Sequence, residues 1–221
     1  MLFLAVQSTY DAVELGLFDS SFCIGKQSVS KIDASAQLIP ILDTLLRHHG
    51  VRYQELPFCA VSQGPGPFTT LRTVIATMNG LAYATHIPLV GVNALIALIH
   101  EYDSLAQHNV CALLQAFSGD VYMGWRLAGA SEVQVRVIAL ASLPSYIQLA
   151  QVDQVHIIGN GALLCKDILF SDSINSVINT TSFLHSSLDA IAQNGYEEWT
   201  KKNRGSLSLR PLYLKNHPAQ N

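Results

Sequence analysis

A rigid corner between a strand and a helix limits what this chain can fold into more than any other feature of its sequence. Residues 64–72, GPGPFTTLR, follow an apolar run at 58–62 and open a stretch, 71–84, with apolar positions at helical spacing. Glycine-rich turns there often bind phosphate, because free backbone N–H groups and the helix dipole favour an anion. Here Pro65 and Pro67 remove two N–H groups, and no Lys-Ser or Lys-Thr pair follows. The segment therefore predicts a stiff strand-to-helix corner and a poor phosphate loop.

Hydrophobic periodicity predicts an α/β protein built in two halves. Strands are expected where apolar residues alternate or run together, and helices where they recur every three to four residues. In the first half the expected strands are 2–6, 10–18, 21–29, 58–62 and 89–92, and the expected helices are 36–49, 71–85 and 94–102. In the second half the expected strands are 110–116, 121–127, 133–137 and 155–159, and the expected helices are 143–150, 162–170 and 184–200. This order predicts mixed sheets flanked by helices, in two domains, 1–104 and 105–221.

Composition indicates a soluble chain with apolar surface to spare. Of 221 residues 49% are hydrophobic and only 13% are charged, so the core can be filled and an apolar patch should remain for a partner. A net charge of −3 does not suit a protein that grips nucleic acid unaided. The four cysteines are far apart and indicate reduced, mostly buried thiols in the cytoplasm. The longest apolar run, 87–99, is shorter than the ~20 residues of a membrane span, so no membrane association is expected.

No residue pattern in the sequence predicts an active site. The histidines lack the HExxH spacing of a zinc site, and no Gly-x-Ser-x-Gly nucleophile motif is present. The aspartates at 33, 120, 153 and 189 are scattered and not paired. Neither catalysis nor a resident metal is therefore expected of this chain.

The corner also carries a resemblance to a known family. It resembles the signature GPGSFTGLR of the bacterial TsaB (YeaZ) family, matching at Gly64, Pro65, Gly66, Phe68, Thr69, Leu71 and Arg72 and departing at Pro67 and Thr70. Further similar segments lie at 79–82, 87–92, 119–122 and 211–215, so the resemblance covers nearly the whole chain. It implies a two-lobe actin/Hsp70/sugar-kinase-like (ASKHA) fold. It also implies a non-catalytic scaffold subunit of the cytoplasmic complex that makes N6-threonylcarbamoyladenosine at position 37 of tRNA (t6A37).

The resemblance implies partners and no resident cofactor. A TsaD-like catalytic subunit and a TsaE-like ATPase would bind directly, and tRNA only indirectly through the complex. ATP and Mg²⁺ would bind only at a junction with the partner. Gln7 and Gln115 stand where the family commonly has Asp, and Phe117 stands where it often has Arg. Because hard cations prefer anionic oxygen, these changes argue against the alternative function, a small ATP-dependent phosphotransferase of the sugar-kinase fold. A peptidase is a further alternative for which no metal pair or nucleophile is found.

The partner surface is expected on helices 36–47 and 71–84. Thr70, Val74 and Met78 are four residues apart and so share one helix face. The predicted interface residues are Leu38, Ile41, Leu42, Leu45, Thr70, Val74, Met78 and Leu81. The alternative is that they pack in the chain's own core. The same face could form a homodimer when the partner is absent.

Two questions stay open at this stage. Arg72, near a helix start, requires a compensating contact. This is either a salt bridge or a hydrogen bond to a loop carbonyl within the chain, or a contact with an acidic partner or a phosphate. The departures from the family pattern reflect either a matching change in the partner or a lost function; they lie at Gln7, Ala34, Pro67, Thr70, Val74, Gln115 and Phe117.

Overall fold

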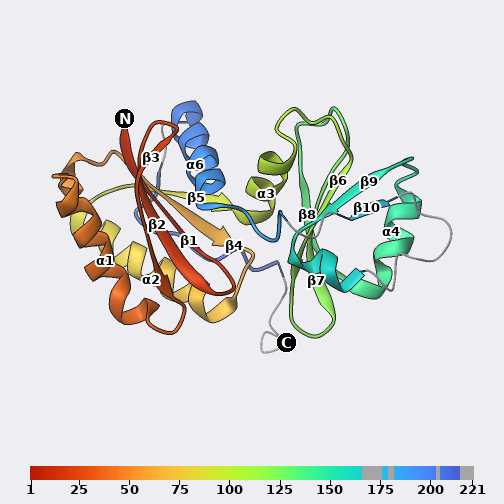
Figure 1. Cartoon of the computed structure of the whole chain (residues 1–221), viewed down its shortest axis with the longest axis horizontal. Coiled ribbons are helices and arrows are strands. Elements are labelled where there is room, and N and C mark those ends of the chain that lie inside the picture. The colour runs from red at the N-terminus through yellow and green to blue at the C-terminus, as the bar shows by residue number, and fades with distance from the viewer. Residues whose placement is uncertain (166–175, 179–181, 203–204, 215–221) are drawn as a thin grey trace. The chain divides into compact units, whose positions relative to one another are not determined.

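The chain forms two compact units in a computed structural model that describes residues 1–165, 176–178, 182–202 and 205–214 (Figure 1). The first unit contains Met1–Ala94 and Ser187–Leu212, and the second contains the described residues of Leu95–Ser186 and Tyr213–Asn221. The division thus differs from the expected 1–104 and 105–221. The physical reason is that the last helix returns to the sheet of the first unit and buries its apolar face there.

A five-stranded mixed sheet forms the centre of the first unit. Its strands are β1 (Leu2–Ser8), β2 (Ala12–Asp19), β3 (Phe22–Ser30), β4 (Cys59–Gly64) and β5 (Leu89–Asn93). They are ordered β3-β2-β1-β4-β5, with β1, β2 and β3 antiparallel and with β4 and β5 parallel to β1. Parallel pairing needs a crossover, and the GPGPFTTLR corner begins the crossover helix between β4 and β5.

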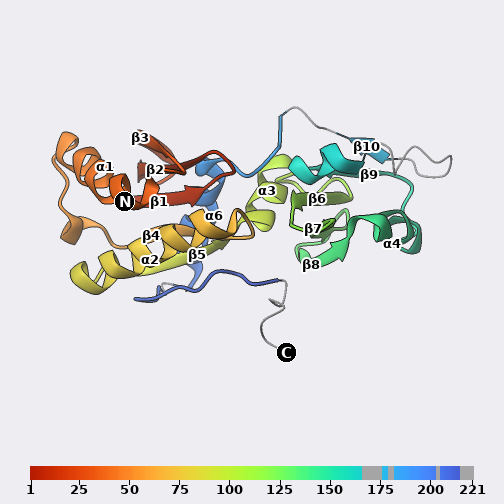
Figure 2. The same cartoon turned by 90° about the horizontal axis from the view of Figure 1, so that it is seen from below.

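Helices cover both faces of this sheet (Figure 2). On one face α1 (Ala34–His48) and α2 (Phe68–Thr85) pack on the strands and on each other. The core there comprises alternate strand residues and one stripe of each helix, among them Leu4, Val6, Leu15, Leu38, Leu42, Val74 and Met78. On the other face lies α6 (Leu188–Lys202). There the Phe58 ring stacks between Phe3 at 4.6 Å and Trp199 at 4.9 Å, centroid to centroid.

The second unit repeats the strand arrangement of the first. Its strands are β6 (Val110–Gln115), β7 (Asp120–Arg126), β8 (Gln134–Ala139), β9 (Val155–Ile158) and β10 (Ser176–Ile178), in the order β10-β9-β6-β7-β8. Here too three strands run antiparallel, and the two further strands run parallel to the first. The two halves that the periodicity predicted are therefore present, and β10 is a strand that it did not predict.

Helices flank the second sheet as well. On one face α3 (Ala94–Tyr102) lies close to β7, because a Cβ on Gly124 would come within 3.1 Å of Ile99 Cδ1. On the other, α4 (Leu143–Leu149) packs in the cluster that holds Trp125. The expected helix at 162–170 is a 3-10 helix over Asn160–Cys165, and residues 166–170 lie outside the described part.

Two helix ends differ from prediction for local reasons. The second helix begins at Phe68, not at 71, because extended Pro67 forms its N-cap. The last helix begins at Leu188, not at 184, because the Ser187 hydroxyl accepts a hydrogen bond from the Ala190 amide at 3.1 Å. Within the described residues, no helix combines the length and the apolar character needed to cross a bilayer.

The C-terminal segment packs back on the first unit. Ser206 pairs with Leu89 through two backbone hydrogen bonds of 2.8 and 2.9 Å. Farther along, the side-chain amide of Asn79 on α2 donates to the Leu209 carbonyl and accepts from its N–H. These contacts partly cover the β5 edge of the sheet.

Candidate functional site

The GPGPFTTLR corner is a structural turn with an exposed cation at its helical end. Gly64 has φ +87, and a Cβ there would come within 2.7 Å of Leu71 Cδ2, so only glycine fits. The Arg72 side chain is exposed, and its guanidinium carbon lies 3.8 Å from the centre of the Phe68 ring. Such a cation–π contact compensates a charge at a helix start without help from another protein. This contact lies within the chain, but it differs in kind from the salt bridge or carbonyl hydrogen bond that was expected there.

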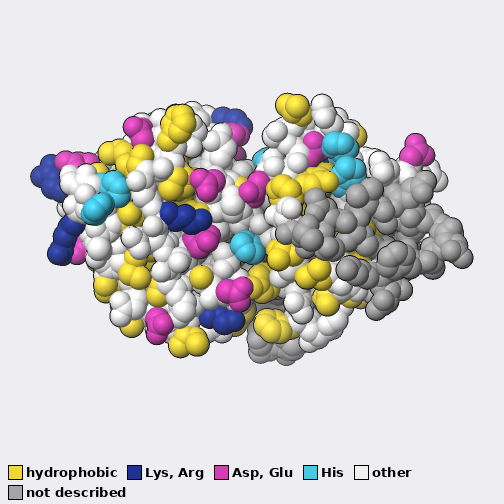
Figure 3. Space-filling model, viewed as in Figure 1, with side chains coloured by type: hydrophobic (Ala, Val, Ile, Leu, Met, Phe, Trp, Pro, Cys, Tyr) yellow, Lys and Arg dark blue, Asp and Glu magenta, His cyan; other side chains and the backbone are white. Residues whose placement is uncertain are grey.

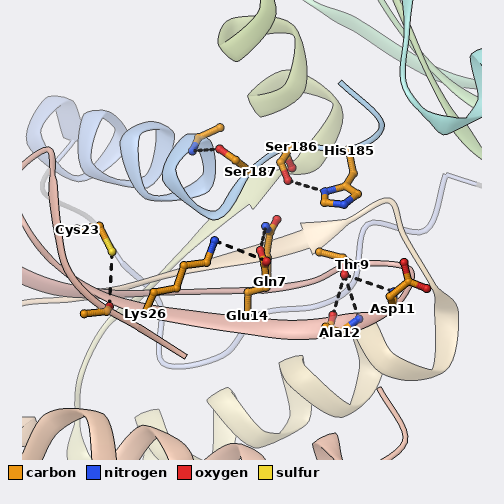
Figure 4. Close-up of polar contacts among 12 residues, drawn as sticks. Gln7, Thr9, Asp11, Ala12, Glu14, Cys23, Lys26, His185, Ser186 and Ser187 are labelled. Atoms are coloured by element: carbon orange, nitrogen blue, oxygen red, sulfur yellow. Dashed lines mark hydrogen bonds and ion pairs between the residues drawn. The ribbon is translucent and has the colours of Figure 1, made fainter. Parts of the chain in front are cut away.

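Gln7, near the carboxyl end of β1, is paired with a neighbouring carboxylate (Figure 4). Gln7 is only 2% exposed, and its amide Nε2 donates to Glu14 Oε2 at 2.7 Å. Glu14 Oε1 lies 3.6 Å from the Lys26 ammonium. A neutral amide therefore occupies the position where the family resemblance implies a metal-binding carboxylate. Among the described residues, no group of three or more His, Cys, Asp and Glu side chains could hold a metal ion.

The turn between β1 and β2 is closed on itself. Thr9 donates from its backbone N–H and from its hydroxyl to the Ala12 carbonyl, at 2.8 and 3.0 Å. The same hydroxyl accepts from the Ala12 and Asp11 amides at 3.1 and 3.4 Å. Because these amides point at Thr9 (Figure 4), they are used within the turn. A phosphate bound here would have to displace the threonine hydroxyl.

Most of the predicted interface residues lie in the core of the first unit. Leu38, Leu42, Val74 and Met78 are 0% exposed, Leu45 is 2% exposed and Thr70 is 7% exposed. Only Ile41 and Leu81 reach the surface in part. The alternative, packing in the chain's own core, therefore describes these side chains. The reason is that α1 and α2 share one face of the sheet and bury their wide apolar stripes against it and against each other.

The same two helices present a different set of side chains to solvent. On α2 the exposed positions recur every three to four residues and are mostly small: Thr69, Arg72, Ala76, Gly80, Tyr83 and Ala84. Tyr83 is 82% exposed, and Ile39 on α1 is 40% exposed. Small residues on a helix face let another helix approach closely. Sequence reasoning missed this stripe, although its spacing was readable, because the apolar stripe beside it was the stronger signal.

The remaining departures from the family pattern fall in three settings. Ala34 is buried at the first turn of α1. Gln115 ends β6, and its backbone N–H donates to the Asn160 side chain at 2.9 Å. Phe117 is 71% exposed in the β6–β7 turn, where Ser118 and Gly119 have positive φ. Ala34 thus belongs to the first unit, and Gln115 and Phe117 belong to the second.

The thiols are poor nucleophiles. Cys59, Cys111 and Cys165 are buried, as most cysteines were expected to be, and only Cys23 is exposed. Burial raises the pKa of Cys165 to about 11 and raises the pKa of Cys59 further. Burial likewise raises the pKa of the exposed Cys23 thiol, with the Asp189 charge as a smaller cause. All four thiols therefore stay protonated near neutral pH.

Comparison with known proteins gives this geometry its context. The family model described as "TsaD: tRNA N6-adenosine threonylcarbamoyltransferase" matches residues 29–204. The chain belongs to the TsaD family. A curated relative, the tRNA threonylcarbamoyladenosine biosynthesis protein TsaB of Escherichia coli (strain K12), is 24% identical over 123 residues, which are 55% of this chain and 53% of the relative. The chain thus spans about half the length of the curated TsaB relatives it matches first.

Solved structures show which fold the chain has. A Pseudomonas aeruginosa protein, described as similar to peptidase YEAZ, superposes with a TM-score of 0.74 at 21% identity, over 97% of this chain and 99% of that one. An Arthrobacter polyphosphate/ATP-glucomannokinase superposes with a TM-score of 0.53 at 9% identity, over 91% and 99% of the two chains. The resemblance to TsaB (YeaZ) and the sugar-kinase-like fold class are thereby confirmed.

Proposed function

We propose that this chain is a non-catalytic accessory subunit in the synthesis of t6A37 in tRNA. In this role it binds a TsaD-like catalytic subunit and, together with a TsaE-like ATPase, supports it in the cytoplasm. Membership of the TsaD family and the TsaB-named relatives support the pathway. The observation that carries the accessory role is Gln7, a buried amide committed to Glu14 at the position where a metal-binding carboxylate would serve catalysis.

The outer face of α1 and α2 is the surface we assign to the TsaD-like subunit. Two small residues, Ala76 and Gly80, are exposed there, between Arg72 and Tyr83 along the helix. A Cβ on Gly80 would meet nothing within 4 Å, so the chain itself does not require glycine at this position. Close approach of a partner helix would explain the small residues. The same face would form a homodimer when the partner is absent.

Nucleotide and tRNA are assigned to the complex and not to the isolated chain. The β1–β2 turn uses its own amides, and Gln7 offers no carboxylate for Mg²⁺. ATP with Mg²⁺ would therefore bind only at a junction that the partner completes. On the face of the molecule in Figure 3, Lys and Arg side chains are few and stand apart. With a net charge of −3, the chain has little to hold an RNA backbone, so tRNA would be bound mainly by other subunits.

The test is association with the TsaD-like subunit of the same organism, measured by light scattering after gel filtration with and without ATP and Mg²⁺. We expect a stable complex for the wild type and none for Ala76→Arg, which puts a charge on the outer face of α2. Gln27→Arg, at an exposed position of β3, is the matched control and should bind normally. No complex with the wild type under any condition would overturn the proposal. Unchanged binding by folded Ala76→Arg would overturn the assignment of the surface.

A further inference from the structure

Five polar side chains form one connected cluster in the second unit. Tyr102 ends α3, Asp103 follows it, His108 lies in the loop before β6, Arg126 ends β7 and His156 is the second residue of β9. They meet at the amino ends of the parallel strands β6 and β9. The cluster is separate from the residues discussed above and does not depend on the proposed function.

Asp103 is the fixed end of the cluster. It is 6% exposed and accepts from Arg126 Nη2 at 2.6 Å and from the His108 and Gln107 amides at 2.9 and 3.1 Å. Burial by itself would raise the pKa of this carboxyl. The two backbone hydrogen bonds and the Arg126 charge outweigh burial, so that the pKa lies below its ordinary value. Asp103 therefore stays ionised throughout the range in which histidines titrate.

Two stacked imidazoles connect Asp103 to Tyr102. His108 Nδ1 lies 3.4 Å from Asp103 Oδ1, and its ring stacks on His156 with centroids 4.3 Å apart and an interplanar angle of 26°. His156 Nδ1 lies 2.6 Å from the Tyr102 hydroxyl. The Tyr102 ring also contacts Phe183 edge to face at 5.0 Å. The end of α3 is thus joined to the start of β9 through the His156 ring.

This arrangement favours a neutral His156. A neutral Nδ1 can accept the Tyr102 hydroxyl proton, whereas a protonated ring has no acceptor. Two stacked rings also resist carrying two positive charges. Burial, and after it the His108 charge, lower the pKa of His156, and Asp103 opposes them only in part. Among the described residues, the groups that face His156 are Tyr102 from α3, Asp103 and His108 from the following loop, and Arg126 from β7 through Asp103.

We propose that the Tyr102–His156–His108–Asp103 cluster is a pH-sensitive latch, closed when His156 is neutral and released when it is protonated. Release frees the end of α3 from the start of β9 and leaves the Asp103–Arg126 pair in place. The sign follows from linkage, because a histidine that protonates more readily when released favours the released state in acid. The latch is closed when the pH is above the ordinary pKa of an imidazole, and it weakens as the pH falls below that pKa. Each pKa unit of difference between the closed and released states corresponds to about a tenfold change in the released population.

Hydrogen exchange on the full chain at pH 7.5 and 5.5, corrected for intrinsic exchange rates, tests the latch. In the wild type, amides of 98–109 and 155–158 should lose several-fold protection at pH 5.5, whereas amides of β1 should not. His156→Gln keeps an acceptor for Tyr102 and does not titrate, so its protection should be the same at both pH values. His48→Gln removes an exposed histidine of α1 and should retain the wild-type response.

Equal acid loss in the wild type and in His156→Gln would overturn the latch. If His156→Gln fails to fold, Tyr102→Phe and an NMR titration of the wild-type His156 ring decide the question. Tyr102→Phe keeps the ring against Phe183 and should shrink the pH response. The His156 ring should titrate below a free imidazole, and His108→Gln should move the titration upward. The proposal would also be overturned if the His156 ring had the pKa of an ordinary imidazole and if His108→Gln did not change that pKa.

Discussion

Replacing Gly195 with alanine tests how closely α6 lies on its sheet. An added Cβ would come within 2.4 Å of Ala60 Cβ on β4 and 3.5 Å of Val92 Cγ2 on β5. Ala60 has no rotatable side chain that could move away, so helix and strand would have to separate. Gly80 on α2 provides the opposite case, because a Cβ there would meet nothing within 4 Å.

The two substitutions share one favourable effect and differ in one unfavourable effect. Alanine in a helix interior is favoured over glycine by about 1 kcal/mol, because glycine loses more backbone entropy on folding. Gly80→Ala should therefore raise the free energy of unfolding by about 0.5–1 kcal/mol. Overpacking typically costs about 1–3 kcal/mol, so Gly195→Ala should lower it by up to about 2 kcal/mol. The two variants should thus differ by about 1–3 kcal/mol.

Urea denaturation followed by circular dichroism measures both variants under the same conditions. Ala60→Gly removes the opposing Cβ, and the double variant with Gly195→Ala should be more stable than the sum of the two single effects predicts. Gly195→Ala that is as stabilising as Gly80→Ala would refute the close packing of α6 on β4. So would additive effects of Gly195→Ala and Ala60→Gly.

Three further predictions follow from the first unit. Met78→Ala, in the core, should lower the free energy of unfolding by about 2–5 kcal/mol in urea titrations; a change within 0.5 kcal/mol would contradict its burial. Gln7→Glu puts a second carboxylate beside Glu14, so this variant should gain stability relative to the wild type as pH falls from 8 to 5, and a parallel pH profile would argue against their contact. Asn79→Ala removes both hydrogen bonds to Leu209 and should raise hydrogen exchange of 206–210 several-fold, whereas unchanged exchange would exclude Asn79 as the anchor.

Local signals in the sequence predicted the corner and most of the elements. Pro65 and Pro67 restrict the backbone on either side of Gly66, and an apolar strand and a periodic helix adjoin them. Local residues alone therefore indicate the turn. Local periodicity also predicted four of the five strands of the second sheet. The last helix was predicted as an element. Its return to the first unit depends on which sheet its apolar face packs against, and periodicity does not report this.

The inward face of α2 shows why the site was harder to predict. Spacing places Thr70, Val74 and Met78 on one face, but it does not say whether that face meets the sheet or a partner. Which face of α2 is buried depends on α1, because α1 packs on the same side of the sheet as α2 and contacts it. The face of α2 with the small residues is left exposed. The latch is harder still, because Tyr102 and His156 are 54 residues apart and only the fold brings them together.

The measurement that tests the accessory role most directly is reconstituted synthesis of t6A37. Purified TsaD-like and TsaE-like proteins of the same organism would be given tRNA, ATP, Mg²⁺ and the threonylcarbamoyl donor, with and without this chain. The account predicts t6A37 only when the chain is present, its loss with Ala76→Arg, and unchanged synthesis with Gln27→Arg. Equal synthesis without the chain, or transfer by the chain alone, would contradict it.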